Sequence, residues 1–436
     1  MVIKLGCIAD DFTGASDLAN NLVRAGMRVT QVMGIPSKNE ANDFATNDPS
    51  KYGDAIVVSL KSRTIPAADA IAQSLAALHW LKEQGAQQIY FKYCSTFDST
   101  TLGNIGPVTE ALMQALGTDF TIATPAFPDN GRTVFKGYLF VGDALLNESG
   151  MQNHPLTPMM DANLVRVLQQ QCSGKVGLTD YKAIASGPAA ISASFAEHRA
   201  NGIRIAIIDA LSNQDLINLG ISLKGMPLIT AGSGVAIGLA QNFGISASKT
   251  ASVLPQPQGH QAIVSGSCSV ASNAQVKHFI DQGLPSFAID PLASEESSDV
   301  AKGAARAMVW ATQMLGDMDA GRRPQSPILI YSTASPDRIQ TVQSALGVQK
   351  ASELVEQTLG TITKRLVDIG VKQLIIAGGE TSGACVQALG IKQMQIGPQI
   401  DPGVAWCFAP QGLHITLKSG NFGSTDFFSK AFMQLS

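Results

Sequence analysis

The feature that most constrains this chain is a repeated alternation of short apolar strands and amphipathic helices. Residues Val2–Ala9 form a predicted strand, and a helix follows with Ala15, Leu18, Ala19, Leu22 and Val23 on one face. This alternation is typical of a parallel sheet covered by helices on both faces. The stretch Thr133–Val141 is predicted to be a hairpin insertion. Further strands are predicted at Ala55–Leu60, Gln88–Tyr93, Phe120–Ala123, Ile203–Ile208 and Pro227–Thr230.

A linker interrupts the alternation near residue 255. The stretch Val253–His260 contains two prolines and one glycine among polar residues, which favours an extended connection. We therefore predict two α/β domains with largely parallel sheets, residues 1–252 and 261–436, with the active site in the cleft between them. The second domain is predicted to contain strands at Ala262–Ser265, Ile328–Tyr331, Gln373–Ala377 and Ile415–Leu417, and helices near Ser297–Leu315 and Ser352–Ile369.

Composition excludes several classes of protein. Hydrophobic residues make up 45% of the 436 residues and charged residues only 15%, so much of the chain is expected to be buried. The net charge of −3 argues against a general binder of nucleic acid or membrane surfaces. The first apolar run ends at Asp10, too early for a signal peptide, and no apolar run is long enough to span a membrane.

The six cysteines are too far apart to form a zinc or redox pair, and the six histidines show no metal-binding spacing. Free thiols are typical of a reducing compartment, so we predict a cytoplasmic protein. The metal ligands, if any, and a possible homo-oligomer are left open.

Three glycine-rich turns in the second domain follow predicted strands and precede helices. They are Ala377–Gly383 (AGGETSG), Ser265–Ser269 (SGSCS) and Ser419–Ser424 (SGNFGS). Glycine lets a backbone approach an anion closely, and a helix N-terminus offers unpaired N–H groups. A single turn of this kind is more simply a tight connection, but three at the carboxyl ends of strands indicate a nucleotide site. The candidate ATP-binding residues are Ser265, Ser267, Gly378, Gly379, Glu380, Thr381, Ser382, Gly383, Gly420 and Gly423.

In the first domain, polar residues cluster after the predicted strands. Cations could bind a carboxylate there, and hydroxyl groups could bind a polyol. Two simpler interpretations stay open: Asp11 could cap a helix, and a lysine such as Lys92 could lie at a solvated strand end. The candidate substrate-binding residues are Asp10, Thr13, Ser16, Asp17, Arg63, Lys92, Ser95, Thr96, Arg132 and His154.

Six motifs together resemble the four-carbon acid sugar kinase family. They are ADDFTGASD, KYCSTFDST, TPAFPDNGRT, SGSCS, GGETSG and SGNFGSTDFF, in the family's order, and the similarity runs from Lys4 to Phe428. Within the family, CSTFDST is most like the branch that acts on 3-oxo-tetronates. D-threonate and erythronate kinases share most of these motifs and remain alternatives.

This resemblance implies an N-terminal substrate domain, a C-terminal ATP domain and transfer of the ATP γ-phosphate to the 4-hydroxyl of a 3-oxo-tetronate. It implies that Ser265, the turn Gly378–Gly383 and Gly423 bind ATP. We expect Mg²⁺ to offset the phosphate charge and Asp11 to act as the general base. Arg63, Lys92 and Arg132 are expected to bind the substrate carboxylate.

Two other classes of protein fit part of this pattern. A nicotinamide oxidoreductase of polyhydroxy acids would also be α/β, but the chain lacks the GxGxxG motif with a downstream acidic residue. A two-domain solute-binding protein would also fit the domain pattern, but the missing signal peptide argues against a periplasmic one. Assays for ADP release and for NADH absorbance would separate the three classes.

Overall fold

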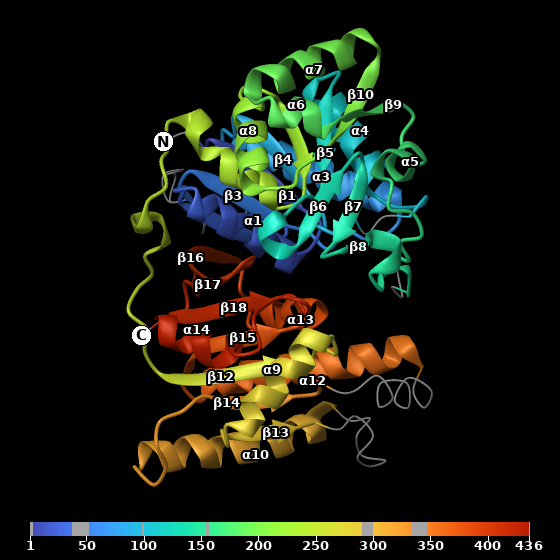
Figure 1. Ribbon diagram of the computed structural model, residues 1–436. Helices are drawn as coiled ribbons and strands as arrows, with labels where there is room; N and C mark the ends of the chain where they lie inside the picture. The colour runs from blue at the N-terminus through green and yellow to red at the C-terminus, as the bar shows by residue number, and fades with distance from the viewer. Residues whose placement is uncertain are drawn as a thin grey trace. The chain divides into compact units, whose positions relative to one another are not determined.

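The computed structural model describes residues 3–36, 52–97, 100–153, 157–289, 300–333 and 347–435. The chain divides into two compact units, Met1–Val253 and Leu254–Ser436, called here the N-terminal and C-terminal units. Figure 1 shows both, coloured from blue to yellow-green and from yellow to red.

The N-terminal unit is built on one parallel sheet. Its strands lie in the order β2, β3, β1, β4, β11, β5, β10, β9. The central strand β1 pairs with β3 and β4, so that Ala9 lies opposite both Ser59 and Lys92. The bounds are β1 Leu5–Ala9, β2 Val29–Met33, β3 Ala55–Ser59, β4 Gln88–Lys92, β5 Thr121–Thr124, β9 Lys175–Thr179, β10 Ile203–Ile208 and β11 Leu228–Ala231.

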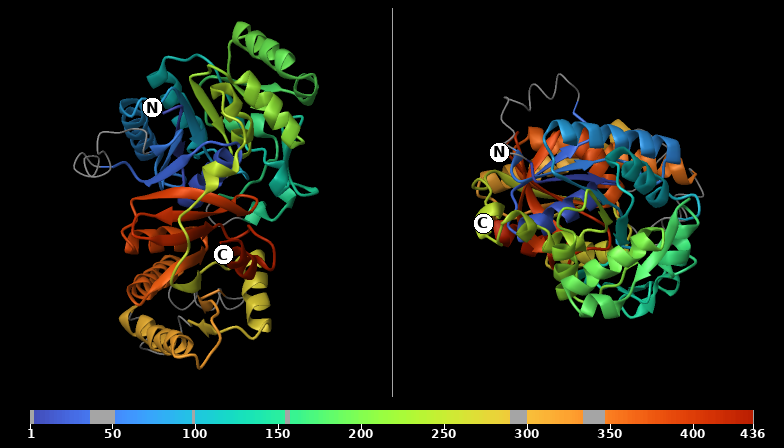
Figure 2. Two further views of the ribbon diagram at one scale, coloured as in Figure 1. Left: turned by 90° about the vertical axis from the view of Figure 1, so that its left-hand side faces the viewer. Right: turned by 90° about the horizontal axis from the view of Figure 1, so that it is seen from above.

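Two groups of helices cover opposite faces of this sheet (Figure 2). The connections through α1 and α3 leave the centre of the sheet in opposite directions, and right-handed crossovers then place these helices on opposite faces. Helix α3 packs on α4, while α1 packs beside the 3₁₀ turn η5, which in turn packs on α8. The helices are α1 Phe12–Arg24, α3 Ala67–Glu83, α4 Ile105–Leu116, α5 Leu164–Gln169, α6 Tyr181–Ala185, α7 Pro188–Ala200 and α8 Asn213–Ser222; η5 is Gly234–Gly238.

A small antiparallel sheet interrupts the N-terminal unit after β5. It contains β6 Arg132–Phe135, β7 Tyr138–Val141 and β8 Ala144–Leu145. The pairing of Phe135 with Tyr138 closes the first hairpin. The predicted hairpin insertion is therefore confirmed.

The C-terminal unit has a mixed sheet in the order β13, β14, β12, β15, β18, β17, β16. The first five strands are parallel, whereas β17 is antiparallel to both β18 and β16. The sequence analysis did not predict this antiparallel part. The bounds are β12 His260–Ser265, β13 Ser286–Ala288, β14 Ile328–Tyr331, β15 Val371–Ala377, β16 Gln393–Asp401, β17 Val404–Ala409 and β18 Leu413–Lys418.

Helices α10, α12 and α13 pack together in the C-terminal unit, and α9 packs with α14 (Figure 1). A core of apolar side chains includes Ile263 of β12, Phe279 of α9, Trp406 of β17 and Phe428 of α14. The Trp406 indole N–H donates to the Ala431 carbonyl at 2.9 Å, which satisfies the polar atom of this buried side chain. The helices are α9 Val270–Asp281, α10 Val300–Asp319, α12 Val348–Asp368, α13 Gly379–Ala388 and α14 Phe427–Leu435.

The prediction of two α/β domains is confirmed, and the predicted strands agree with the observed ones to within a few residues. Strands β2, β8, β9, β13, β16 and β17 were not predicted. None of the six cysteines forms a disulfide bond. None of the helices in the described ranges is long and apolar enough to cross a membrane.

Candidate active site

Charged residues gather at the carboxyl edge of the N-terminal sheet. Asp10 and Asp11 follow β1, Arg63 follows β3, and Lys92 ends β4, the strands on either side of β1. The Arg63 guanidinium donates to the Asp10 carboxylate at 2.8 and 2.9 Å, and its Nη2 lies 2.8 Å from Asp11 Oδ1. The Lys92 ammonium, only 2% exposed, lies 3.9 Å from Asp11 Oδ1. Four sequence-predicted residues thus form one network.

Asp11 is also the N-cap of α1. Its Oδ1 accepts from the Gly14 backbone N–H at 3.0 Å, and its Oδ2 accepts from the Thr13 hydroxyl at 3.1 Å. Burial raises the pKa of Asp11, but the charges of Arg63 and Lys92 and these hydrogen bonds outweigh burial and lower it. The Asp11 carboxylate is therefore ionised, firmly held and weakly basic.

Asp17 lies one helical turn after Thr13 and is 3% exposed. Burial raises the pKa of its carboxyl group to about 6, and the Lys92 charge and the Ser233 hydroxyl oppose that shift only in part. Among the described residues, none donates a hydrogen bond to Asp17 Oδ1. The Arg132 charge also acts on this carboxyl group, which places Arg132 within electrostatic range of the cluster.

Two supporting residues were not predicted. Asn104, at the start of α4, donates from its amide nitrogen to the carbonyls of Ser62, Arg63 and Ile65 at 2.8 to 3.1 Å, which fixes the loop that carries Arg63. Gly14 leaves no room for a side chain: a Cβ there would lie 2.1 Å from both Asp11 Oδ1 and Lys92 Nζ. A glycine in DDFTGAS could have been recognised from the sequence, whereas Asn104 carried no signal.

The other predicted substrate residues lie in different surroundings. The Ser16 hydroxyl bonds Gln31 Oε1 at 2.8 Å within a buried network between α1 and β2, so it lies apart from the charged cluster. Ser95 and Thr96 are buried in the turn after β4, where Thr96 Oγ1 lies 2.9 Å from Cys94 Sγ. His154 lies outside the described residues.

The turn after β4 contains a strained residue. Phe97 has φ of +53°, which is uncommon for a side chain of this size, and its ring is fully buried edge-on against Tyr93. Such backbone conformations cluster at functional sites, because the surrounding structure must hold them. The turn that carries Ser95 and Thr96 is therefore held in a set conformation beside Lys92.

In the C-terminal unit, the three glycine-rich turns follow β12, β15 and β18, which are neighbours in the sheet. The N–H groups of Gly266 and Ser267 donate to the Ala377 carbonyl at 3.0 and 3.2 Å. The Gly378 N–H donates to the Lys418 carbonyl at 2.8 Å, and the Ser269 hydroxyl donates to the Gly420 carbonyl at 2.5 Å. The three turns are thus hydrogen-bonded to one another at the carboxyl edge of the sheet.

Gly378 requires glycine because its φ is +125°, which other residues rarely adopt. Gly379 begins α13 with open space around its Cβ position, and Glu380 is exposed beside it. The Ser265 hydroxyl lies 2.7 Å from that of Thr333. Ser382 and Gly383 lie within α13, and the Ser382 side chain is fully buried, so these two are less accessible than the turn before them.

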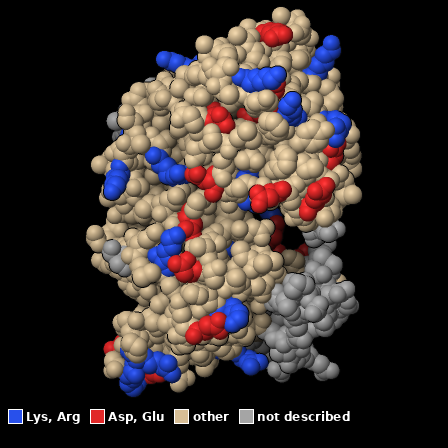
Figure 3. All heavy atoms as spheres, in the orientation of Figure 1, with Lys and Arg blue, Asp and Glu red and all other residues tan. Residues whose placement is uncertain are grey.

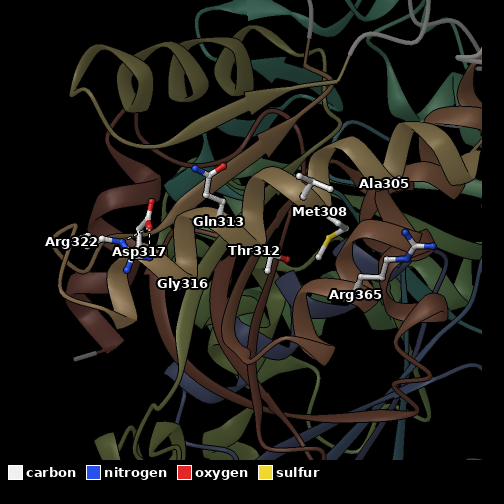
Figure 4. A pocket seen from close by; sticks show the side chains of 9 residues that line it. Ala305, Met308, Thr312, Gln313, Gly316, Asp317, Arg322 and Arg365 are labelled. Atoms are coloured by element: carbon white, nitrogen blue, oxygen red, sulfur yellow. Dashed lines mark hydrogen bonds and ion pairs between the residues drawn. The ribbon is translucent and has the colours of Figure 1, made fainter.

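One hollow of the described structure lies elsewhere, on the C-terminal unit. Figure 4 shows its lining on α10 and α12, with Met308, Thr312, Asp317 and Arg365 among the labelled side chains. None of its lining residues belongs to the three turns. On the face in Figure 3, the acidic and basic side chains of the described residues are interspersed rather than gathered by sign.

The described residues contain no group of three or more histidine, cysteine or acidic side chains that could hold a metal ion. The three turns instead offer hydroxyl groups and one carboxylate, that of Glu380. Hard oxygen donors of this kind suit Mg²⁺, which usually takes only one or two protein ligands and binds with substrate phosphates.

Comparisons with known proteins agree with the division of the chain into an N-terminal and a C-terminal unit. Residues 5–239 match a model described as a sugar-binding N-terminal domain, and residues 262–428 match a nucleotide-binding C-terminal domain. A Burkholderia multivorans protein named 3-oxo-tetronate kinase is 54% identical over 99% of this chain and 97% of its own, and a Pseudomonas fluorescens protein of the same name is 52% identical with the same coverage. A solved Salmonella typhimurium structure has a TM-score of 0.84 and 42% identity over 99% of both chains.

Proposed function

Because the chain belongs to the four-carbon acid sugar kinase family, we propose that it transfers the γ-phosphate of ATP to the 4-hydroxyl of a 3-oxo-tetronate. The products are the 3-oxo-tetronate 4-phosphate and ADP. The single observation that carries this proposal is the full-length identity of 52 to 54% to proteins named 3-oxo-tetronate kinase. We further propose a cytoplasmic location, where ATP is available and the six cysteines, none of which forms a disulfide, would stay reduced.

The C-terminal unit would bind ATP at the surface formed by the three turns. The N–H groups of the third turn and the N-termini of α9 and α13 suit phosphate oxygens. Mg²⁺, when bound, would neutralise charge on the phosphates. Glu380 and the hydroxyls of Ser267 and Thr381 are the oxygen donors in these turns that would hold the ion.

The N-terminal unit would bind the sugar acid at the charged cluster. We assign the substrate carboxylate to the three cations of this cluster, Arg63, Lys92 and Arg132. Hydroxyl groups of Thr13, Ser95 and Thr96 would then bind the substrate's own hydroxyls and ketone.

Phosphoryl transfer needs a well-placed acceptor and little covalent help from the protein. The firmly held Asp11 carboxylate is suited to orient the 4-hydroxyl through a hydrogen bond. Its lowered pKa makes it a weak proton acceptor, whereas Asp17 has a pKa of about 6 and an oxygen without a hydrogen-bond partner among the described residues. We therefore assign orientation to Asp11 and propose that Asp17 accepts the proton.

The test is ADP release from ATP and Mg²⁺ across a panel of 3-oxo-tetronates, D-threonate and D-erythronate. We expect a 3-oxo-tetronate to be the best acceptor. The phosphorus NMR signal of a phosphate on the primary C4 carbon is split by two protons, whereas that of a secondary ester is split by one. ADP release only with threonate or erythronate would reassign the substrate, and an NADH absorbance change without ADP release would overturn the kinase assignment.

A further inference from the structure

Lys418 is a buried lysine beneath the third glycine-rich turn. It is the last residue of β18 and is 0% exposed. Its ammonium donates to the carbonyls of Ser419, Gly420 and Phe422 at 2.9, 3.1 and 3.1 Å, and to the Ser272 hydroxyl of α9 at 3.1 Å. One side chain therefore binds three carbonyls of the turn that follows it.

Gln275 of α9 binds the rest of the same turn. Its amide nitrogen donates to the carbonyls of Phe422, Gly423 and Ser424, each at 3.0 Å. Between them, Lys418 and Gln275 bind five carbonyls of the segment from Ser419 to Ser424.

Because these carbonyls point toward Lys418 and Gln275, the directions of the N–H groups that follow them are also determined. In a trans peptide the carbonyl and the following N–H lie on opposite sides, so the N–H groups after these carbonyls point away from Lys418. Among the described residues, none accepts a hydrogen bond from the N–H groups of Gly420, Asn421 or Gly423. Outward N–H groups of consecutive residues, such as those of Gly420 and Asn421, are suited to bind an anion together.

The ammonium is buried among uncharged hydrogen-bond partners. Burial lowers the pKa of Lys418 to about 7, while the oxygen acceptors around it favour the charged form. The acidic groups nearest this turn are Asp401 of β16, which accepts from the Ser424 N–H and pairs with Lys430 of α14, and the exposed Asp426.

The neighbouring turns and α9 add Glu380, Cys268, Lys277 and His278 as titratable groups. The hydrogen bonds of the Lys418 ammonium instead go to uncharged oxygen atoms, the three carbonyls of the turn and the Ser272 hydroxyl.

We propose that Lys418 is a positioning residue for the nucleotide: its protonated side chain holds the third turn in the shape that presents Gly420, Asn421 and Gly423 to phosphate. This inference rests on the proposed function, because the phosphate is that of ATP or ADP. The glycine motifs by themselves predict a site made of backbone groups, and Lys418 adds to this site a cation that titrates.

The proposal has a pH consequence of definite sign. A bound phosphate stabilises the charged lysine and raises its pKa in the complex. The affinity for ADP is therefore highest where Lys418 is protonated in both the free protein and the complex. It falls as the pH rises above about 7, and it levels off above the pKa of Lys418 in the complex. In this window, binding must take up a proton.

The experiment is calorimetric titration of the full chain with ADP from about pH 6 to about pH 9, in buffers of different ionisation enthalpy. The variants are Lys418→Met, which keeps the length without the charge, and Lys277→Met, which removes an exposed lysine of the same unit, 74% exposed in its side chain. ADP is the ligand in all three titrations, so any protonation of ADP itself affects the three proteins equally.

We expect wild-type affinity to fall by up to about tenfold per pH unit above pH 7, with proton uptake, and Lys277→Met to behave in the same way. Lys418→Met should bind ADP about 10- to 100-fold more weakly at pH 7 and with no such pH dependence. Wild-type affinity that is flat with pH and shows no proton uptake would overturn the proposal even if Lys418→Met fails to fold. A Lys418→Met protein with wild-type affinity would also overturn it, whereas a wild-type protein that binds no ADP would overturn the proposed function itself.

Discussion

The guanidinium of Arg63 holds the carboxylate of Asp10 with two hydrogen bonds, of 2.8 and 2.9 Å. The two residues are 53 positions apart in the sequence and meet because β1 and β3 are neighbours in the sheet. The same guanidinium reaches Asp11, so one cation supports both carboxylates at the start of α1. Arg63 therefore organises the charged cluster as well as adding to its positive charge.

Replacement of Arg63 by alanine should weaken both binding and folding. It leaves two largely buried carboxylates without their main partner, and the loss of a charge-assisted contact costs about 1.5–3 kcal/mol. We expect KM for the sugar acid to rise about 10- to 150-fold, with little change in KM for ATP, and the melting temperature to fall. Arg166→Ala removes a more exposed arginine, paired with Asp161, and should change neither the KM for the sugar acid nor the melting temperature. An unchanged KM in Arg63→Ala would remove Arg63 from the substrate site.

Asp17→Asn should lower kcat by about 10²–10⁴-fold, because it removes the proposed proton acceptor while keeping the shape of the side chain. KM for ATP should stay the same. The wild-type enzyme should lose activity as the pH falls below about 6, since burial raises the pKa of Asp17 to about 6 and only the ionised form accepts a proton. A pH profile of kcat that stays flat from pH 7 to well below pH 6 would contradict this assignment.

Asp11→Asn separates capping from catalysis. Asparagine caps a helix about as well as aspartate, so the melting temperature should change little through the cap itself. The loss of charge beside Arg63 and Lys92 should displace the acceptor hydroxyl and lower kcat by about 10²-fold. Side-by-side kcat and melting measurements decide the point, because full activity would leave Asp11 with the capping role alone.

Gly379→Val tests the nucleotide turn. Open space surrounds the Cβ position, so the protein should fold normally, but the side chain should block the approach of phosphate and abolish ATP binding. Gly316→Val on α10 also points into open space and serves as the matched control, with normal ATP binding. If both variants bind ATP alike by calorimetry, the turn does not bind the nucleotide.

A fragment of residues 254–436 should fold and bind ATP. A start near Gly259, as the linker prediction suggests, would remove two contacts. The Pro255 carbonyl contacts His414 Nε2 at 2.8 Å, and Leu254 packs on the core that contains Trp406. The longer fragment should therefore melt cooperatively and bind ATP as the full chain does. Loss of cooperative melting would show that the second core depends on the first.

The sequence was enough to predict the fold class and most strands, because strand and helix periodicity and turn chemistry are local properties. It also predicted the three glycine turns and the acidic start of α1, where residue type and position carry the signal. Strands β2, β8, β9, β13, β16 and β17 were missed, because which strand pairs with which depends on contacts distant in the sequence.

Only the tertiary structure decided how the site residues meet. The neighbouring positions of β12, β15 and β18 in the sheet bring the three glycine-rich turns into contact, and Arg63 reaches Asp10 by the pairing of β1 with β3. Lys418 ends a strand, and its burial and lowered pKa depend on α9, which supplies Ser272 and Gln275 from nearly 150 residues earlier. Burial and charge proximity, which set pKa values and hydrogen bonding, are properties of the folded chain, so no local pattern could reveal them.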